Sequence, residues 1–299
     1  MSSRTKNLFL LHLIILIFGF TGILGKLISI DALPLVFWRC LIGAIALGIF
    51  MAIRKSIRSY SLKTAARFAV IGLITAAHWI TFFGSIKVST VSVALATLAS
   101  ASLFVSFLEP LFHRKRIDPK EIVLGILVIV GLVFIFSFET SYRLGVVLAL
   151  ISAFLAALFS VLNSLEIKKY DALNISLYEL SAAAIGTFIF LAISGNVNLE
   201  LVLLSNSDWV YMLLLGTIAT AFAFVVSVEV MKVLTPFTVA ISINLEPIYS
   251  IVLALIIFGD EEKMTPQFYI GAVIILGAIF VEAVLKRKSN RKQIGSNSV

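Results

Sequence analysis

Two titratable side chains of this chain lie deep inside long apolar stretches, where a charged group is costly. Glu246, which precedes Pro247, and His78, which precedes Trp79, each lie about 16 Å into their stretch at a helical rise of ~1.5 Å per residue. Imidazole titrates near neutral pH, a low dielectric favours a protonated carboxyl, and Trp offers a face to aromatic or cationic groups. Pro247 cannot donate a backbone N–H, which favours a broken helix beside Glu246. These residues could carry a proton or bind an amine; alternatively, they only pack and form hydrogen bonds within the fold.

Other polar residues in apolar stretches are further candidates for the same site. Arg39 and Glu179 each lie about 7 Å from an end of their apolar stretch. If these stretches are helices that cross a membrane, as argued below, the two ends lie at opposite membrane surfaces, so an ion pair between Arg39 and Glu179 is not expected. Arg39 either extends to the surface or binds a substrate carboxylate, and Glu179 is close enough to its surface for a structural role. The remaining candidates for substrate binding or coupling are Asn244, Ser100, Tyr178 and Tyr249.

The composition of the whole chain excludes most classes of protein. Of 299 residues, 60% are apolar or aromatic and 13% are charged. In soluble domains about 45–50% of residues are apolar and about 25% are charged. The mean hydropathy is +1.09. A single globular core could not bury this apolar surface, which excludes a soluble enzyme. One Cys, six Pro and 17 Gly exclude a disulfide scaffold, a disordered chain and collagen.

Ten apolar stretches are long enough to cross a bilayer, which takes about 20 residues. We therefore predict an all-α polytopic membrane protein without room for an extramembrane domain. The first stretch follows basic residues as in a signal peptide, but Lys26 stands where a cleavage site is expected, so a retained helix is favoured. The predicted spans are 8–26, 34–53, 67–86, 90–112, 121–138, 143–167, 174–194, 208–231, 235–258 and 267–285.

The basic residues between these spans alternate between rich and poor segments. The N-terminus, the four loops that follow even-numbered spans and the C-terminal tail hold 19 of the 24 Lys and Arg residues. Positive charge marks cytoplasmic segments, so both termini are predicted to be cytoplasmic. The net charge of +8 then reflects orientation, and no nucleic-acid-binding fold accompanies it.

Ten spans divide into two halves of five, and an odd number of spans gives the halves opposite orientations. We predict one repeat over residues 1–140, an inverted repeat over 141–288 and a cytoplasmic tail over 289–299. A shift of 146 positions places Ser100 opposite Glu246 and Gly131 opposite Gly277. Identities are few, and any two five-helix blocks could align as well. An inverted repeat would provide two nearly equivalent states, which is the basis of alternating access.

Several segments of the chain resemble the drug/metabolite transporter superfamily, specifically its ten-helix EamA type. Residues 245–249, Gly259 to Glu262 and Thr265 to Gln267 match the second-half pattern, with the glycines Gly271 and Gly277 following. The first half departs from the pattern, because Ser100-Ala101 replaces a mid-helix Pro and Arg114 to Arg116 replaces a common acidic residue. The resemblance covers nearly the whole chain. It implies two five-helix bundles around a central cavity and export of small metabolites such as amino acids, amines, purines or drugs.

The predicted function is thus secondary transport of small metabolites by alternating access. Exchange of the metabolite for a proton, carried by Glu246 or His78, is part of this hypothesis. No Walker, zinc, dinucleotide or nucleophile motif is present, so no catalytic residue, cofactor or metal is predicted. The alternative is an intramembrane enzyme or sensor that uses the same buried polar residues. The expected partners are a small-molecule substrate and the lipid bilayer, with no nucleic acid. The expected location is a bacterial-type plasma membrane, as a monomer or homodimer.

Overall fold

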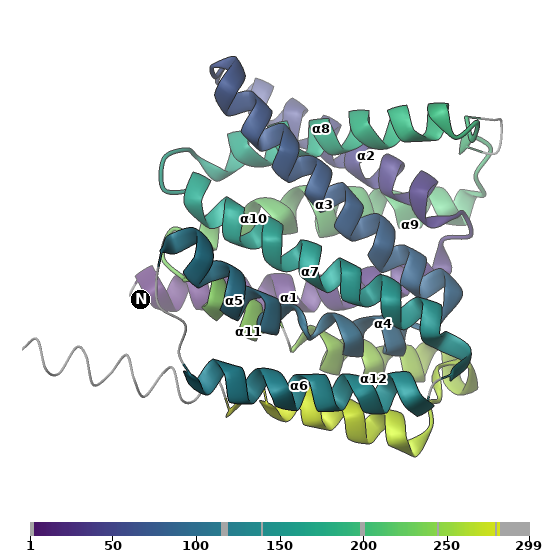
Figure 1. Ribbon diagram of the computed structural model, residues 1–299. Helices are drawn as coiled ribbons and strands as arrows, with labels where there is room; N and C mark the ends of the chain where they lie inside the picture. The colour runs from purple at the N-terminus through teal and green to yellow at the C-terminus, as the bar shows by residue number, and fades with distance from the viewer. Residues whose placement is uncertain are drawn as a thin grey trace, which may run out of the picture.

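The computed structural model of this protein describes residues 3–114, 119–138, 140–197, 201–243, 245–278 and 280–281. These residues form helices joined by short loops, and none of them is in a β-strand. Most helices run side by side in alternating directions (Figure 1). We call the side of the bundle where the first helix begins the N-terminal side, and the side where that helix ends the far side.

Seven stretches of helix in the described chain are long and apolar enough to cross a membrane. Five of them correspond to the helices α1, α2, α3, α7 and α8, and the other two are interrupted. The five bounds are Ser3–Leu27, Ala32–Ile53, Leu62–Val88, Arg143–Glu166 and Ala172–Ile193. The interrupted stretches are α4 (Val91–Leu98) with α5 (Ala101–His113), and α9 (Asn206–Gly216) with the π-helix η3 (Thr217–Phe222) and α10 (Ala223–Val230).

The other three predicted spans are not among these seven stretches, so a count of ten crossings stays a prediction. They correspond to α6 (Pro119–Phe138), to α11 (Pro236–Ile243) with α12 (Glu246–Phe258), and to a helix that includes Pro266–Ala278. Two short 3-10 helices complete the described elements, η1 (Thr140–Tyr142) and η4 (Gly259–Glu262).

Two helices, one in each half of the chain, are broken near their middle. The first breaks between α4 and α5 at Ala99 and Ser100, and the second breaks just before Glu246. A shift of 146 positions superposes the two breaks. The half-helix α4 packs against α12 and α5 packs against α11, so the two broken helices run antiparallel with their breaks together. This arrangement is the one expected of an inverted repeat, in which discontinuous helices form the binding region.

Glycine permits the closest approaches between helices. A Cβ at Gly72 of α3 would lie 2.2 Å from a backbone oxygen of α8 and 2.7 Å from a Cα. Gly131 of α6 and Gly271 of the last helix each face the other's carbonyl oxygen, at 2.8 and 2.7 Å from the Cβ they would carry. Small residues thus replace hydrophobic burial as the basis of helix association in a membrane. Figure 1 shows α6 and the last helix as a pair at the edge of the bundle.

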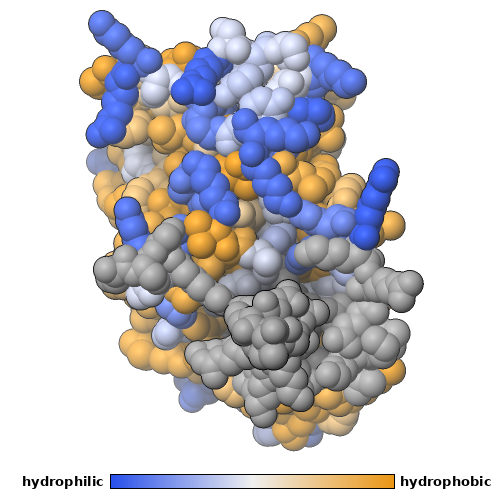
Figure 2. All heavy atoms as spheres, turned by 90° about the vertical axis from the view of Figure 1, so that its left-hand side faces the viewer, coloured by the Kyte–Doolittle hydropathy of each residue, from blue (hydrophilic) through white to orange (hydrophobic). Residues whose placement is uncertain are grey.

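The surface matches a protein that faces lipid along its sides and water at its ends. Many large apolar side chains are exposed on the helices, including Phe9, Ile53, Ile193 and Phe280. A soluble monomer does not expose apolar surface on this scale. Hydrophilic side chains gather on the N-terminal side, as Figure 2 shows for the described part of that face.

Candidate functional site

A cavity lies where the two broken helices meet. It comprises about 990 Å³ of space free of protein atoms, including the part open to solvent. Its lining comes from α1, α3, α4, α5, α7, α10, α11 and α12, together with one side chain of α2, Arg39. The lining continues toward the N-terminal side as far as Met231, at the end of α10, and Val239, in α11.

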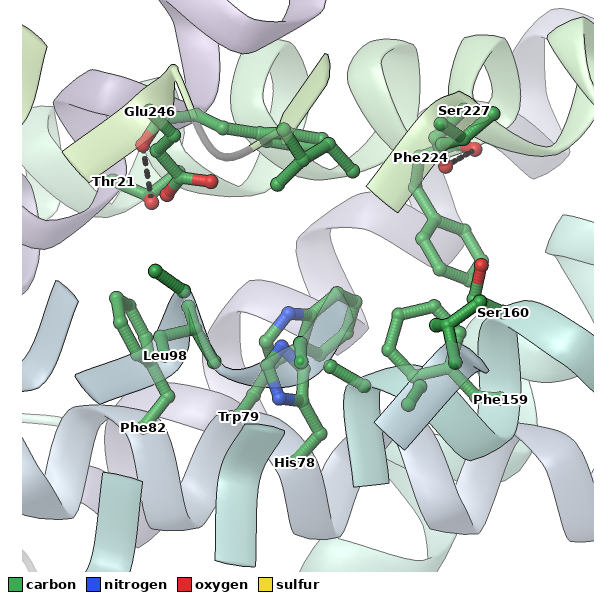
Figure 3. Close-up of a pocket in the computed structure, with 18 of the residues that line it drawn as sticks. Thr21, His78, Trp79, Phe82, Leu98, Phe159, Ser160, Phe224, Ser227 and Glu246 are labelled. Carbon is green, nitrogen blue, oxygen red and sulfur yellow. Dashed lines mark hydrogen bonds between the residues drawn. The ribbon is translucent and has the colours of Figure 1, made fainter. Parts of the chain in front are cut away.

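Glu246 begins α12 and lines this cavity. Its side chain is 5% exposed, and no hydrogen bond or ion pair joins its carboxylate to any residue that the structure describes. Figure 3 shows Glu246 on the wall across from His78, Trp79 and Phe82. Pro247 fits the first turn of α12 because the N–H groups there have no partner within the helix. The break predicted from Pro247 thus presents a free carboxylate to the cavity.

The His78 side chain forms hydrogen bonds with Ser152 of α7. Its Nδ1 lies 3.0 Å from the carbonyl oxygen of Ser152 and 2.8 Å from the Ser152 hydroxyl oxygen. A carbonyl oxygen only accepts, so this contact favours the tautomer with the proton on Nδ1 and leaves Nε2 as an acceptor. The imidazole stacks on Phe82, with the ring centroids 6.2 Å apart, and Phe159 lies beside it at 5.5 Å. His78 can therefore present one acceptor nitrogen within an aromatic wall.

Arg39 supplies a buried cation on the same wall. Its side chain is 2% exposed, and its guanidinium carbon lies 3.9 Å from the centroid of the Trp79 ring. Its Nε donates to the Thr220 hydroxyl at 3.0 Å, and no carboxylate pairs with it in the described structure. The Thr220 hydroxyl, in the π-helix, in turn donates to the carbonyl oxygen of Leu215, five residues earlier in α9. Of the two expectations for Arg39, extension to the membrane surface is wrong, because Trp79 and Thr220 hold the guanidinium inside the bundle.

Three of the remaining candidates, Ser100, Tyr178 and Tyr249, are not among the residues that line the cavity. Ser100 is buried, and its hydroxyl donates to the carbonyl oxygen of Thr97 at 2.7 Å. Tyr178 donates to the carbonyl oxygen of Arg58 on the N-terminal side, and Tyr249 is 40% exposed on the surface. Asn244 lies outside the described residues. The structure thus brings together Glu246, His78, Trp79 and Arg39 and leaves the other tested positions apart.

Glu179 forms a separate buried polar contact between α7 and α8. Its Oε2 accepts a hydrogen bond from Asn163 Nδ2 at 3.1 Å. Its other carboxyl oxygen and the Asn163 carbonyl oxygen are buried without a partner among the described residues. Glu179 and Arg39 are each bonded elsewhere, which agrees with the prediction that they do not pair.

Several lining residues could not be found by sequence reasoning. Thr21, Phe159 and Phe224 line the cavity, but Thr and Phe are common in apolar helices. Only the rotation of each helix about its axis separates them from side chains that face lipid. No group of three or more His, Cys, Asp or Glu side chains in the described structure could hold a metal ion.

Comparison with known proteins identifies the family. The model of the EamA-like transporter family matches this chain twice, over residues 5–137 and 143–283. The chain belongs to the EamA-like transporter family. It is therefore a multi-pass membrane transporter with a two-repeat EamA architecture.

Three curated relatives of this EamA-like chain are named as uncharacterized transporters. YxxF of Bacillus subtilis is 23% identical over 96% of this chain and 93% of its own length. A transporter of Archaeoglobus fulgidus is 24% identical over 94% of this chain and 98% of its own. YdfC of Bacillus subtilis is 22% identical over 91% of this chain and 89% of its own length. A solved crystal structure shares the fold, with a TM-score of 0.69 at 18% identity, over 95% of this chain and 99% of that chain.

Proposed function

We propose that this EamA-like transporter carries small zwitterionic metabolites of the amino-acid type across the membrane by alternating access. The observation that carries the proposal is the pair of opposite charges in one cavity. Among the residues that the structure describes, Glu246 has no hydrogen-bond or ion-pair partner on one wall, and Arg39 has no carboxylate partner on the other, beside Trp79. A buried charge is costly unless it is paired, so each side chain favours a ligand of opposite charge.

The space between the two charges is apolar and aromatic. The rings of Trp79, Phe82, Phe159 and Phe224 line it, as is usual for small-molecule sites, which are mostly apolar with a few placed polar groups. A substrate ammonium would face Glu246, a carboxylate would face Arg39, and an apolar side chain would contact the rings. Guanidinium groups pair with carboxylates through two parallel hydrogen bonds, which adds geometric selectivity. The proposed substrate class is therefore an amino acid with an apolar or aromatic side chain, or a close analogue.

The two halves of the chain provide the conformational change in this proposal. We place the repeats at residues 1–140 and 141–288, consistent with the two family matches. Their broken helices meet at the cavity, so rocking of one half against the other would expose the same residues to each side in turn.

We also propose an orientation and a direction. Exposed basic residues on the N-terminal side, such as Arg54, Lys63 and Lys168, mark it as cytoplasmic by the positive-inside rule. Both termini would then be cytoplasmic in a bacterial-type inner membrane, and transport would be outward. Proton exchange would use Glu246 or His78, since both can change protonation state while in contact with the substrate.

The proposal is tested by binding to the purified protein. The unfolding temperature is measured with amino acids, with amines that lack a carboxylate and with acids that lack an amine. We expect saturable stabilisation that is strongest for an amino acid with an apolar side chain. Stabilisation by none of the three classes, or an equal effect of all three, would contradict a zwitterion site.

A further inference from the structure

The far side of the bundle is tied together around one buried carboxylate, that of Glu262 in η4. The side chain is fully buried (0% exposed). Its Oε1 lies 3.0 Å from Lys26 Nζ and accepts the backbone N–H of Val91 at 3.1 Å. Its Oε2 accepts the backbone N–H of Ser92 at 2.9 Å and the Ser92 hydroxyl at 2.8 Å. Four donors thus satisfy one carboxylate.

These contacts join the two repeats. Glu262 follows α12 in the second repeat, whereas Lys26 ends α1 and Ser92 begins α4 in the first repeat. The first N–H groups of a helix lack partners within the helix and carry partial positive charge, so a carboxylate is well placed there. Because α4 and α12 also line the cavity near their breaks, Glu262 holds the far ends of two cavity helices together.

A second contact closes the same side. Asp208, at the start of α9, accepts the backbone N–H and the hydroxyl of Ser29, each at 2.7 Å. Lys87, at the end of α3, donates to the carbonyl oxygen of Ile28. The loop after α1 is thereby fixed to α3 and α9, and the far ends of all these helices lie close together. The cavity lining, by contrast, continues toward the N-terminal side.

We infer that Glu262 is the positioning residue that holds the far side of the cavity closed, and that its release from Lys26 and the start of α4 opens that side. The inference rests on the proposed alternating access. Lys26 and Glu261 are partly exposed, so water can replace the bonds of Glu262 as the helices separate. A carboxylate at this place would thus act as a reversible latch, since the same donors can bind it again on closure.

The inference is tested by the side from which the cavity can be labelled. Cys40, the single native cysteine, is replaced by Ser, and Thr21→Cys places a reporter thiol in the cavity lining. A membrane-impermeant maleimide is applied to whole cells and to inverted vesicles. In the parent we expect faster labelling from the N-terminal side. In Glu262→Gln we expect labelling from the far side to rise about tenfold or more, because a charged acceptor is lost.

A matched control lies in the same short helix. Asp260 forms an exposed ion pair with Lys263 at 2.5 Å, so Asp260→Asn should leave both labelling rates unchanged. Lys26→Gln removes one of the four donors and should have a smaller effect than Glu262→Gln. Glu262→Asp keeps the charge and should restore part of the closure.

Two results would overturn the inference. One is far-side labelling of Glu262→Gln at the parent rate, in protein that remains monodisperse. The other is an equal rise from both sides, which would show general loosening of the fold in place of a latch. The assay uses no substrate, so it can succeed even if amino acids do not bind. If the orientation is the reverse of the one proposed, cells and vesicles exchange roles and the latch still stands.

Discussion

Glu246→Gln should separate the stability of the transporter from its ability to bind a cation. The substitution keeps the size and shape of the side chain and removes its ability to carry a negative charge. In the described structure the Glu246 carboxylate is 5% exposed and makes no hydrogen bond or ion pair, so the substitution breaks no protein contact. Burial of an unpaired polar or charged group costs free energy, and that cost falls when the charge is removed. We therefore expect the ligand-free variant to be as stable as the parent or more stable, with a free energy of unfolding higher by up to about 2 kcal/mol.

Ligand binding should change in the opposite direction. A hydrogen bond to a charged group contributes about 1.5–3 kcal/mol, and each 1.4 kcal/mol is tenfold in affinity. Loss of the contact between Glu246 and a substrate ammonium should thus weaken binding about ten- to a hundredfold. A more stable protein that binds more weakly is the pattern expected of a site residue that the fold does not need.

The assay is thermal unfolding of the purified protein with increasing concentrations of the best ligand. Glu229→Gln is the matched control, because Glu229 is an exposed carboxylate that pairs with Lys232 at 2.8 Å. It should leave ligand affinity at the parent value. The reasoning would be refuted if Glu246→Gln lowered the stability of the free protein by more than about 1 kcal/mol, since the carboxylate would then support the fold. Unchanged ligand affinity would refute it equally.

Three further predictions concern packing, the π-helix and the loop before α8. Gly72→Ala should lower the unfolding temperature strongly, because the added Cβ would meet backbone atoms of α8 at 2.2–2.8 Å; a stability equal to the parent would show that α3 and α8 are not this close. Thr220→Val keeps the side-chain shape but leaves Arg39 Nε without its partner, so it should weaken binding of carboxylate ligands in the same thermal assay, whereas binding of amines should not change. Burial would raise the pKa of Asp171, but hydrogen bonds from Asn174 outweigh this and lower the pKa below its ordinary value of 3.8. The contribution of ionised Asp171 to the folding free energy is therefore complete above pH 3.8 and is lost as the pH falls through the lower pKa of the folded state. A scan of unfolding free energy against pH should lack this step in Asp171→Asn. Persistence of the step in the variant would assign it to another group.

The helical fold follows from properties that the sequence displays directly. Long apolar stretches and the few charges within them predict membrane helices, and the described structure has seven stretches of the required length. Pro247 predicts the break beside Glu246. The matching break at Ser100 has no such signal, since no proline occurs there, and it is evident only once α4 and α5 are seen to pack against α12 and α11.

The candidate site could be predicted only where chemistry marks a residue. Glu246, His78 and Arg39 stand out because a charged or titratable side chain is unusual inside an apolar stretch, and Trp79 because its aromatic face follows His78 at the same depth. The position of an aromatic or hydroxyl side chain around its helix is not encoded in the same way. A helix in a membrane is apolar on its lipid face as well as on its packed face, so its sequence does not show which face lines a cavity. For this reason the sequence favours Tyr249 as a site residue, although its side chain lies exposed at the surface.

The central claim is that Glu246 and Arg39 bind the two ends of one zwitterion. The most direct test measures the affinity of the parent, Glu246→Gln and Arg39→Gln for three matched ligands. These are an aromatic amino acid, the amine without its carboxylate and the acid without its amine. The account predicts that the parent binds the amino acid most tightly. Glu246→Gln should lose the preference for the amino acid over the acid, and Arg39→Gln the preference over the amine. Equal losses for all three ligands in both variants would contradict it.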